Sequence, residues 1–246
     1  MDQQTRHALK RDKFVSTTNQ GLEWASENRE QAIKYGGIAA VVIAVLIIWA
    51  VVYHSRSQAA EAALGEAMQT YQTPLANPQQ PAPEGIKTFG SLAERAKAAN
   101  AQFTAIADKY GMTPSGRKAE YFAGLTYEDE GQNQQAEDAL KKVAGSWDSR
   151  LASLGKFALA QLYHNTNRDA QAIDLYNQLS AKPTDTVPYG MAQLTLADLY
   201  NSEGKTEEAK KIYASLKDKD AKGPAGEIAA QKLNPAPAEG APGLPQ

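Results

Sequence analysis

The chain of 246 residues contains no cysteine and only three histidines. The absence of cysteine excludes disulfide bonds, thiolate metal ligands and cysteine nucleophiles. His7, His54 and His164 are so far apart along the chain that their spacing cannot define one site. A Gly-rich phosphate-binding loop is also missing. We therefore expect no cofactor, no bound metal and no enzymatic activity.

A surplus of charge of one sign is missing too. The chain has 26 Lys and Arg against 28 Asp and Glu, a formal net charge of -2. Because nucleic-acid binding depends on a surplus of cations, we expect no nucleic acid as partner. Without a catalytic site we also expect no small-molecule substrate. Valine and isoleucine are scarce outside one segment, whereas alanine is abundant, and this mix favours an all-α fold.

The exceptional segment is residues 36–53, eighteen residues without a charged side chain. At about 1.5 Å of helical rise per residue it would extend about 27 Å, close to the ~30 Å hydrocarbon core of a bilayer. Tyr35, Trp49 and Tyr53 lie near its ends, where aromatic side chains favour the headgroup level. We predict a single transmembrane helix. The alternative is a buried core helix of a soluble protein, but such helices normally carry a polar stripe.

A cleaved signal peptide is a second alternative for this segment. Signal peptides have a short basic start and an apolar run of about 7–15 residues before a small-residue cleavage site. Here about 35 residues precede a longer run, and Val52 to Arg56 is a poor cleavage context. We therefore predict an uncleaved anchor.

Basic residues near the two ends of the span predict its orientation. Arg29 and Lys34 lie close on the N-terminal side, whereas Arg56 is the nearest cation on the other side. This bias predicts a cytoplasmic segment 1–35 in a bacterial inner-membrane protein whose C-terminal domain is periplasmic. Within the segment, residues 9–15 combine three cations with apolar side chains. These residues either contact anionic lipid headgroups or a cytoplasmic partner, or they belong to a solvated, partly helical tail.

After the span the sequence predicts a helical domain over residues 54–233. Residues 57–72 place apolar side chains on one helical face. A Pro-rich insertion at 73–90 interrupts the helices, because four prolines cannot lie inside one. Helix formation resumes at 91–110 and ends at Gly111, and residues 234–246 form a Pro/Ala-rich tail predicted to be disordered.

Three stretches, residues 119–143, 155–179 and 192–216, repeat one pattern. Each reads as a helix, a tight turn and a second helix. Small residues allow the two helices to approach closely, aromatic rings pack between them, and Gly or Asn allows a left-handed backbone in the turn. The matching columns are Gly124, Ala160, Ala197; Tyr127, Tyr163, Tyr200; Gly131, Asn167, Gly204; Ala136, Ala172, Ala209; and Leu140, Tyr176, Tyr213.

This pattern resembles the tetratricopeptide repeat (TPR). The resemblance implies an antiparallel helix-pair solenoid behind the transmembrane helix, although the spacing is 36 and 37 residues rather than 34. Phe103 and Ala99 resemble the second helix of an earlier, degenerate repeat whose first helix would be 57–72. Residues 226–233 would form a short capping helix.

The layout of a short cytoplasmic start, one span and a TPR-like domain resembles the ancillary SecYEG translocon subunit (YfgM-like) family. Residues 55–71 are the part most similar to it, and no diagnostic motif accompanies the layout. The resemblance implies protein partners: Sec translocon subunits, periplasmic chaperones or emerging client chains.

The TPR resemblance also implies a peptide-binding groove along the first helix of each repeat. Its base would be apolar and its rim polar. The alternative for several of these residues, Leu154 and Leu194 especially, is packing against neighbouring helices. Leu125, Gln161 and Asp198 fill positions where some TPR proteins use Asn to clamp a carboxylate, so no clamp is expected. The groove positions are Lys118, Tyr121, Leu125, Glu128, Leu154, Phe157, Gln161, His164, Met191, Leu194, Asp198 and Asn201.

Two remaining polar features have ordinary structural interpretations. His164 is a candidate ligand or, alternatively, a groove or surface residue, and the carboxylates of residues 128–130 are a candidate cluster or a solvated helix end. The sequence as a whole predicts a membrane-tethered protein–protein interaction module, acting as a translocon-associated adaptor or a chaperone-like holdase. The alternative is a structural assembly scaffold for an envelope or secretion complex that binds no client.

Overall fold

The computed structural model describes residues 28–77, 85 and 87–234. Predictions for residues 1–27, for 78–84 and 86 within the insertion, and for 235–246 of the tail lie outside the described residues. The chain divides into two compact units, Met1–Arg56 and Ser57–Gln246. In the described residues every regular element is an α-helix, as predicted, and the β pairing is one isolated bridge between Leu75 and Phe89.

Helix α2, Arg29–Gln72, contains both the predicted span and the predicted helix 57–72. Its apolar part is long and apolar enough to cross a membrane, and none of this stretch is buried within the structure. The core-helix alternative would require burial. Trp49 and Tyr53 stack at 5.4 Å between ring centroids on the surface of the helix.

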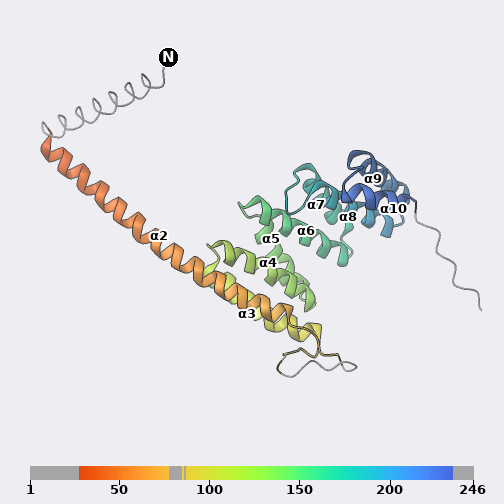
Figure 1. The fold of residues 1–246 in the computed structure, drawn as a ribbon, viewed down its shortest axis with the longest axis horizontal. Helices are drawn as coiled ribbons and strands as arrows, with labels where there is room; N and C mark the ends of the chain where they lie inside the picture. The colour runs from red at the N-terminus through yellow and green to blue at the C-terminus, as the bar shows by residue number, and fades with distance from the viewer. Residues whose placement is uncertain (1–27, 78–84, 86, 235–246) are drawn as a thin grey trace, which may run out of the picture. The chain divides into compact units, whose positions relative to one another are not determined.

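In the described part of the chain, eight helices after α2 belong to the second unit and follow one another in chain order (Figure 1). Each packs mainly on the helices next to it in the chain, which is the contact pattern of a repeat array. Their bounds are α3 Leu92–Tyr110, α4 Pro114–Asp129, α5 Asn133–Ala144, α6 Ser149–Asn165, α7 Asp169–Ala181, α8 Tyr189–Ser202, α9 Thr206–Lys219 and α10 Pro224–Leu233.

The C-terminal part of α2 pairs with α3, as expected for the degenerate first repeat. Residues near the two ends of the Pro-rich insertion lie side by side, because the amide of Ala76 donates to the carbonyl of Phe89 at 2.7 Å. Within the helix pair, the ring of Tyr71 in α2 contacts the ring of Phe103 in α3 edge-on, with 6.0 Å between the ring centroids. Phe103 is fully buried. Phe122 of α4 stacks on the Phe103 ring, with 5.3 Å between the ring centroids. An aromatic cluster therefore joins the pair of α2 and α3 to the following repeat.

Side-chain caps fix where several helices begin. The hydroxyl of Ser91 accepts from the amide of Glu94 at 3.2 Å at the start of α3. At the start of α4 the Thr113 hydroxyl accepts from the amide of Gly116, and the Asp148 carboxylate caps α6 in the same way. Each bond satisfies an amide that has no partner inside its helix.

The turn residues inside the repeats have the predicted left-handed backbone. Gly131, Asn167 and Gly204 have φ angles of 75°, 58° and 77°. Glycine adopts this region freely, and Asn tolerates it better than most residues. The shared geometry confirms that the three turns are equivalent.

The small-residue columns lie where paired helices are closest. Ala136, Ala160 and Ala172 are completely buried, as the repeat pattern predicted. A Cβ added to Gly124 would lie 2.7 Å from the side chain of Leu140, and one added to Gly155 would lie 2.7 Å from the backbone nitrogen of Ala144. Larger residues would therefore separate the helices.

We expect Gly155→Ala to lower the free energy of unfolding by about 1–3 kcal/mol, because the backbone of α5 blocks the added methyl group. The matched control is Gly65→Ala in α2, where an added Cβ has no atom within 4 Å. That change should stabilise by up to about 1 kcal/mol through helix propensity. Thermal unfolding of the solubilised full chain, followed by circular dichroism, measures both. Equal effects of the two changes would contradict the close-approach argument.

Candidate functional site

The first helices of the three full repeats, α4, α6 and α8, carry the twelve predicted groove positions, and the structure buries none of these completely. Lys118, Gln161, Met191, Asp198 and Asn201 are exposed, and the other seven are half-buried. The set therefore occupies accessible or partly accessible positions on three successive helices. We call it the first-helix face.

The apolar members of the first-helix face pack partly into the core. Tyr121, Leu125, Leu154 and Phe157 lie against the main hydrophobic cluster, and Leu194 lies against the C-terminal one. Burial raises the pKa of Tyr121, so its hydroxyl stays neutral at physiological pH. These side chains combine a packing role with some remaining accessibility.

Several polar members of the face already have partners within the chain. The side-chain amide of Asn165 donates to Glu128 at 2.8 Å and links α6 to α4. Nδ1 of His164 lies 2.6 Å from a carboxylate oxygen of Asp169 at the start of α7. Asn165 and Asp169 were missed by sequence reasoning, because a partner in another helix leaves no signature in helical periodicity.

Asp198 is held from two other helices. It accepts a hydrogen bond from the Tyr213 hydroxyl of α9 at 2.6 Å and one from Lys232 of α10 at 2.8 Å. Burial, together with the bond to Asp198, raises the pKa of Tyr213, so the hydroxyl remains a donor at physiological pH. The Asp198 carboxylate therefore contributes to joining the capping helix α10 to the last full repeat.

The three carboxylates at the end of α4 do not converge. Glu128 bonds Asn165, Asp129 accepts from Tyr71 at 3.5 Å, and Glu130 accepts from Gln132 at 3.0 Å. Burial raises the pKa of Asp129. Among the described residues, no group of three His, Asp or Glu side chains could hold a metal ion.

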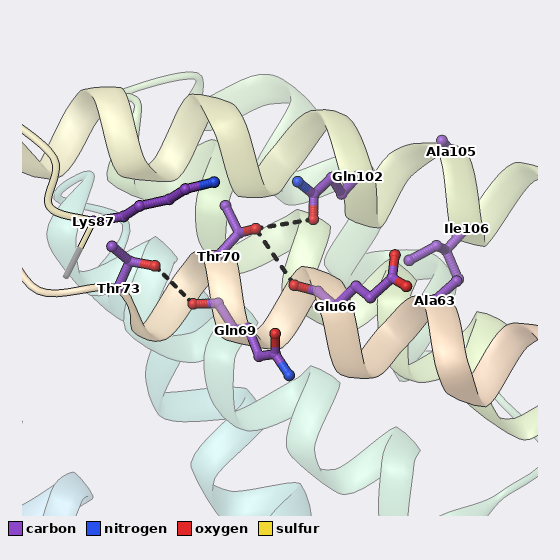
Figure 2. Close-up of a pocket in the computed structure, with 9 residues that line it drawn as sticks. All are labelled: Ala63, Glu66, Gln69, Thr70, Thr73, Lys87, Gln102, Ala105 and Ile106. Atoms are coloured by element: carbon purple, nitrogen blue, oxygen red, sulfur yellow. Dashed lines mark hydrogen bonds between the residues drawn. The ribbon is translucent and has the colours of Figure 1, made fainter. Parts of the chain in front are cut away.

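A cleft of about 560 Å³ lies between α2 and α3 in the first helix pair (Figure 2). The hydroxyl of Thr70 donates to Gln102 across it at 3.2 Å, and Glu66 and Lys87 contribute one charge of each sign. These are the one carboxylate and the one cation among its lining residues. The cleft is a polar surface feature that the sequence did not predict.

The strongest polar network connects two repeats. Glu137 of α5 is nearly buried, and its carboxylate binds Lys141 and Arg168, each at 2.7 Å. The Tyr163 hydroxyl donates to the same carboxylate at 3.2 Å, and the Arg168 guanidinium lies 4.4 Å from the centre of the Tyr163 ring. The bonds from Lys141 and Arg168 outweigh burial and lower the pKa of Glu137.

The described structure is thus an array of antiparallel helix pairs with a candidate binding face. The sequence model of the tetratricopeptide repeat-like domain family matches residues 23–236, most of the chain. The protein belongs to this family. No curated protein and no solved structure matches it significantly. TPR-like domains typically mediate protein–protein interactions.

We expect Glu137→Gln to lower the free energy of unfolding by about 1–3 kcal/mol at pH 7, because an amide cannot neutralise Lys141 and Arg168. Folding lowers the pKa of the Glu137 carboxyl, so this group stabilises the fold at pH values above its unfolded-state pKa, which is near 4.5. This contribution disappears as the pH falls through the folded-state pKa.

Unfolding midpoints measured from pH 7 down to pH 3 test this expectation. The wild-type chain should lose its advantage over Glu137→Gln as the pH drops below about 4.5. Glu207→Gln is the control, since Glu207 is an exposed partner of Lys210. A difference between wild type and Glu137→Gln that does not change with pH would contradict the assignment.

Proposed function

We propose that the protein is a membrane-tethered protein–protein interaction module in a bacterial inner membrane, with a cytoplasmic N-terminus and a periplasmic repeat domain. The observation that supports this most strongly is the combination of a TPR-like array with one helix long and apolar enough to cross a membrane. The few cations after the apolar stretch, compared with those before it, support the orientation.

Its specific role is that of an ancillary translocon-associated adaptor or a chaperone-like holdase for chains emerging from the translocon. The first-helix face supports this role, because half-buried rings and aliphatic side chains lie beside exposed polar residues. Such a surface suits an extended or helical peptide with a few apolar side chains. Sec translocon subunits and periplasmic chaperones are the corresponding partners.

A structural assembly scaffold without client binding is the second candidate. The internal bonds of Glu128 and Asp198 favour it, since polar groups that are already paired contribute less to peptide recognition. Both candidates share the tether and the repeat domain, and they differ in whether the first-helix face contacts unfolded chains.

A photo-crosslinking amino acid placed on the face distinguishes these candidates. In membranes, full-length protein carrying it at Gln161 or Met191 should crosslink to newly translocated chains or translocon subunits. The matched control is Asn177, which is exposed on α7, the second helix of its pair. Adducts at Asn177 equal to those at Gln161 would remove the face as the binding surface. Adducts only to stable envelope proteins would favour the scaffold.

Topology is testable separately, because the chain has no cysteine of its own. Single cysteines introduced at Ser16 and at Lys217 should differ in intact cells: a membrane-impermeant thiol reagent should label only the one at Lys217. After permeabilisation both should react. Labelling of intact cells at Ser16 alone would reverse the orientation.

A further inference from the structure

The loops that connect successive repeats form an edge with two cavities and an exposed tryptophan. The first cavity, of about 280 Å³, lies at α4 and α5, and the second, of about 600 Å³, lies at α6 and α7. We call them the α4–α5 pocket and the α6–α7 pocket. Trp147, in the loop between α5 and α6, lines both of them.

The two pockets are equivalent positions of the repeat. Nine of the ten residues that line the α4–α5 pocket have, 36 positions later, a residue that lines the α6–α7 pocket. Glu120 corresponds to Lys156, for example, and Val143 corresponds to Leu179. The spacing is that of the repeat itself, so the pockets result from the helix-pair architecture rather than from two unrelated surface irregularities.

Trp147 lines both pockets together with Ser146, and 82% of Trp147 is exposed. The Arg117 guanidinium lies 4.7 Å from the centre of its ring, and this guanidinium donates to the carbonyl of Met112 at 3.1 Å. Met112 is itself 84% exposed. A large ring held in place yet left in water is unusual unless a partner covers it, since tryptophan and arginine are frequent anchors of binding interfaces.

The charges around Trp147 indicate the chemistry of that partner. The two linings contain four cations, Arg117, Lys142, Lys156 and Lys182, and one carboxylate, Glu120. Lys142 binds Glu120 at 3.1 Å, which leaves a local excess of positive charge in a chain whose formal net charge is -2. Carboxylates of a ligand would complement this excess.

We propose that this edge is a second peptide-binding site, which takes an extended acidic segment of a partner protein and inserts one large apolar side chain into each pocket. Trp147 lies between the two inserted side chains, and the cations pair with carboxylates that flank them. A lipid surface fits less well, because a flat bilayer would leave both pockets empty. The site shares no residue with the first-helix face.

The test uses the solubilised full-length chain with Trp24→Phe and Trp49→Phe, which leaves Trp147 as its single tryptophan. The probe is an end-blocked peptide of sequence EDLEGEFDE, added to saturation. We expect a saturable blue shift of the tryptophan emission. The amide peptide QNLQGQFNQ and the serine peptide EDSEGESDE should each bind at least about tenfold more weakly.

Variants then assign the binding to the edge, with a dye-labelled copy of the probe as readout. Trp147→Ala and Lys182→Glu should each reduce affinity at least about tenfold, and Trp147→Phe should restore part of the loss. Lys211→Glu on α9 is the charge-matched control and should leave affinity unchanged. Met191→Glu should also leave it unchanged, which separates this site from the first-helix face.

Three results would overturn the proposal: no saturable binding of the probe, equal binding of the acidic and amide peptides, or unchanged affinity in Trp147→Ala. A blue shift with anionic lipid vesicles and none with the probe would assign the edge to a membrane surface instead. Circular dichroism confirms that each variant remains folded. A failure to find client crosslinks at Gln161 would count against the proposed function but would not affect the proposal for this second site.

Discussion

Close approach of paired helices is the constraint on which the rest of the repeat domain depends. Gly124 allows α4 to pack against Leu140 of α5 at a distance that a larger side chain would prevent. Ala160 is the equivalent residue of the next repeat, and it is completely buried. Because each helix packs mainly on its chain neighbours, the order of the helices in the sequence is also their order in the array. Local crossings of this kind therefore determine where every exposed side chain lies.

The same packing produces two surfaces of different character. On the first-helix face, rings such as Phe157 are partly buried, and Phe157 packs edge-on against Tyr176 with 5.7 Å between the ring centroids. Several polar groups of this face are hydrogen-bonded within the chain. At the loop edge the repeats form two pockets, and the side chain of Trp147 is largely exposed. The loop edge therefore combines exposed apolar surface with an excess of cations over carboxylates among the residues that line its pockets.

The repeats, their turns and their buried columns were predictable from the sequence, because helical periodicity and turn chemistry are local properties. Asn167 could be matched to Gly131 before any coordinates, since both positions require a left-handed backbone. The bond from Arg168 to Glu137 and the two partners of Asp198 could not be predicted, because these residues lie outside the helix of the carboxylate that they bind and their placement depends on packing. The span 36–53 and the helix 57–72 were inferred one by one from the sequence, and the structure contains both in one helix, α2.

The exposure of Trp147 illustrates the limit of such prediction most clearly. Nothing in the sequence around Trp147 shows that Arg117, thirty residues earlier, lies against its ring. The proposed membrane tether would change what such a surface needs in order to bind a partner. A protein confined near the bilayer meets partners held there at high effective concentration. Under the proposed function, contacts too weak to capture a partner from bulk solution would then be sufficient.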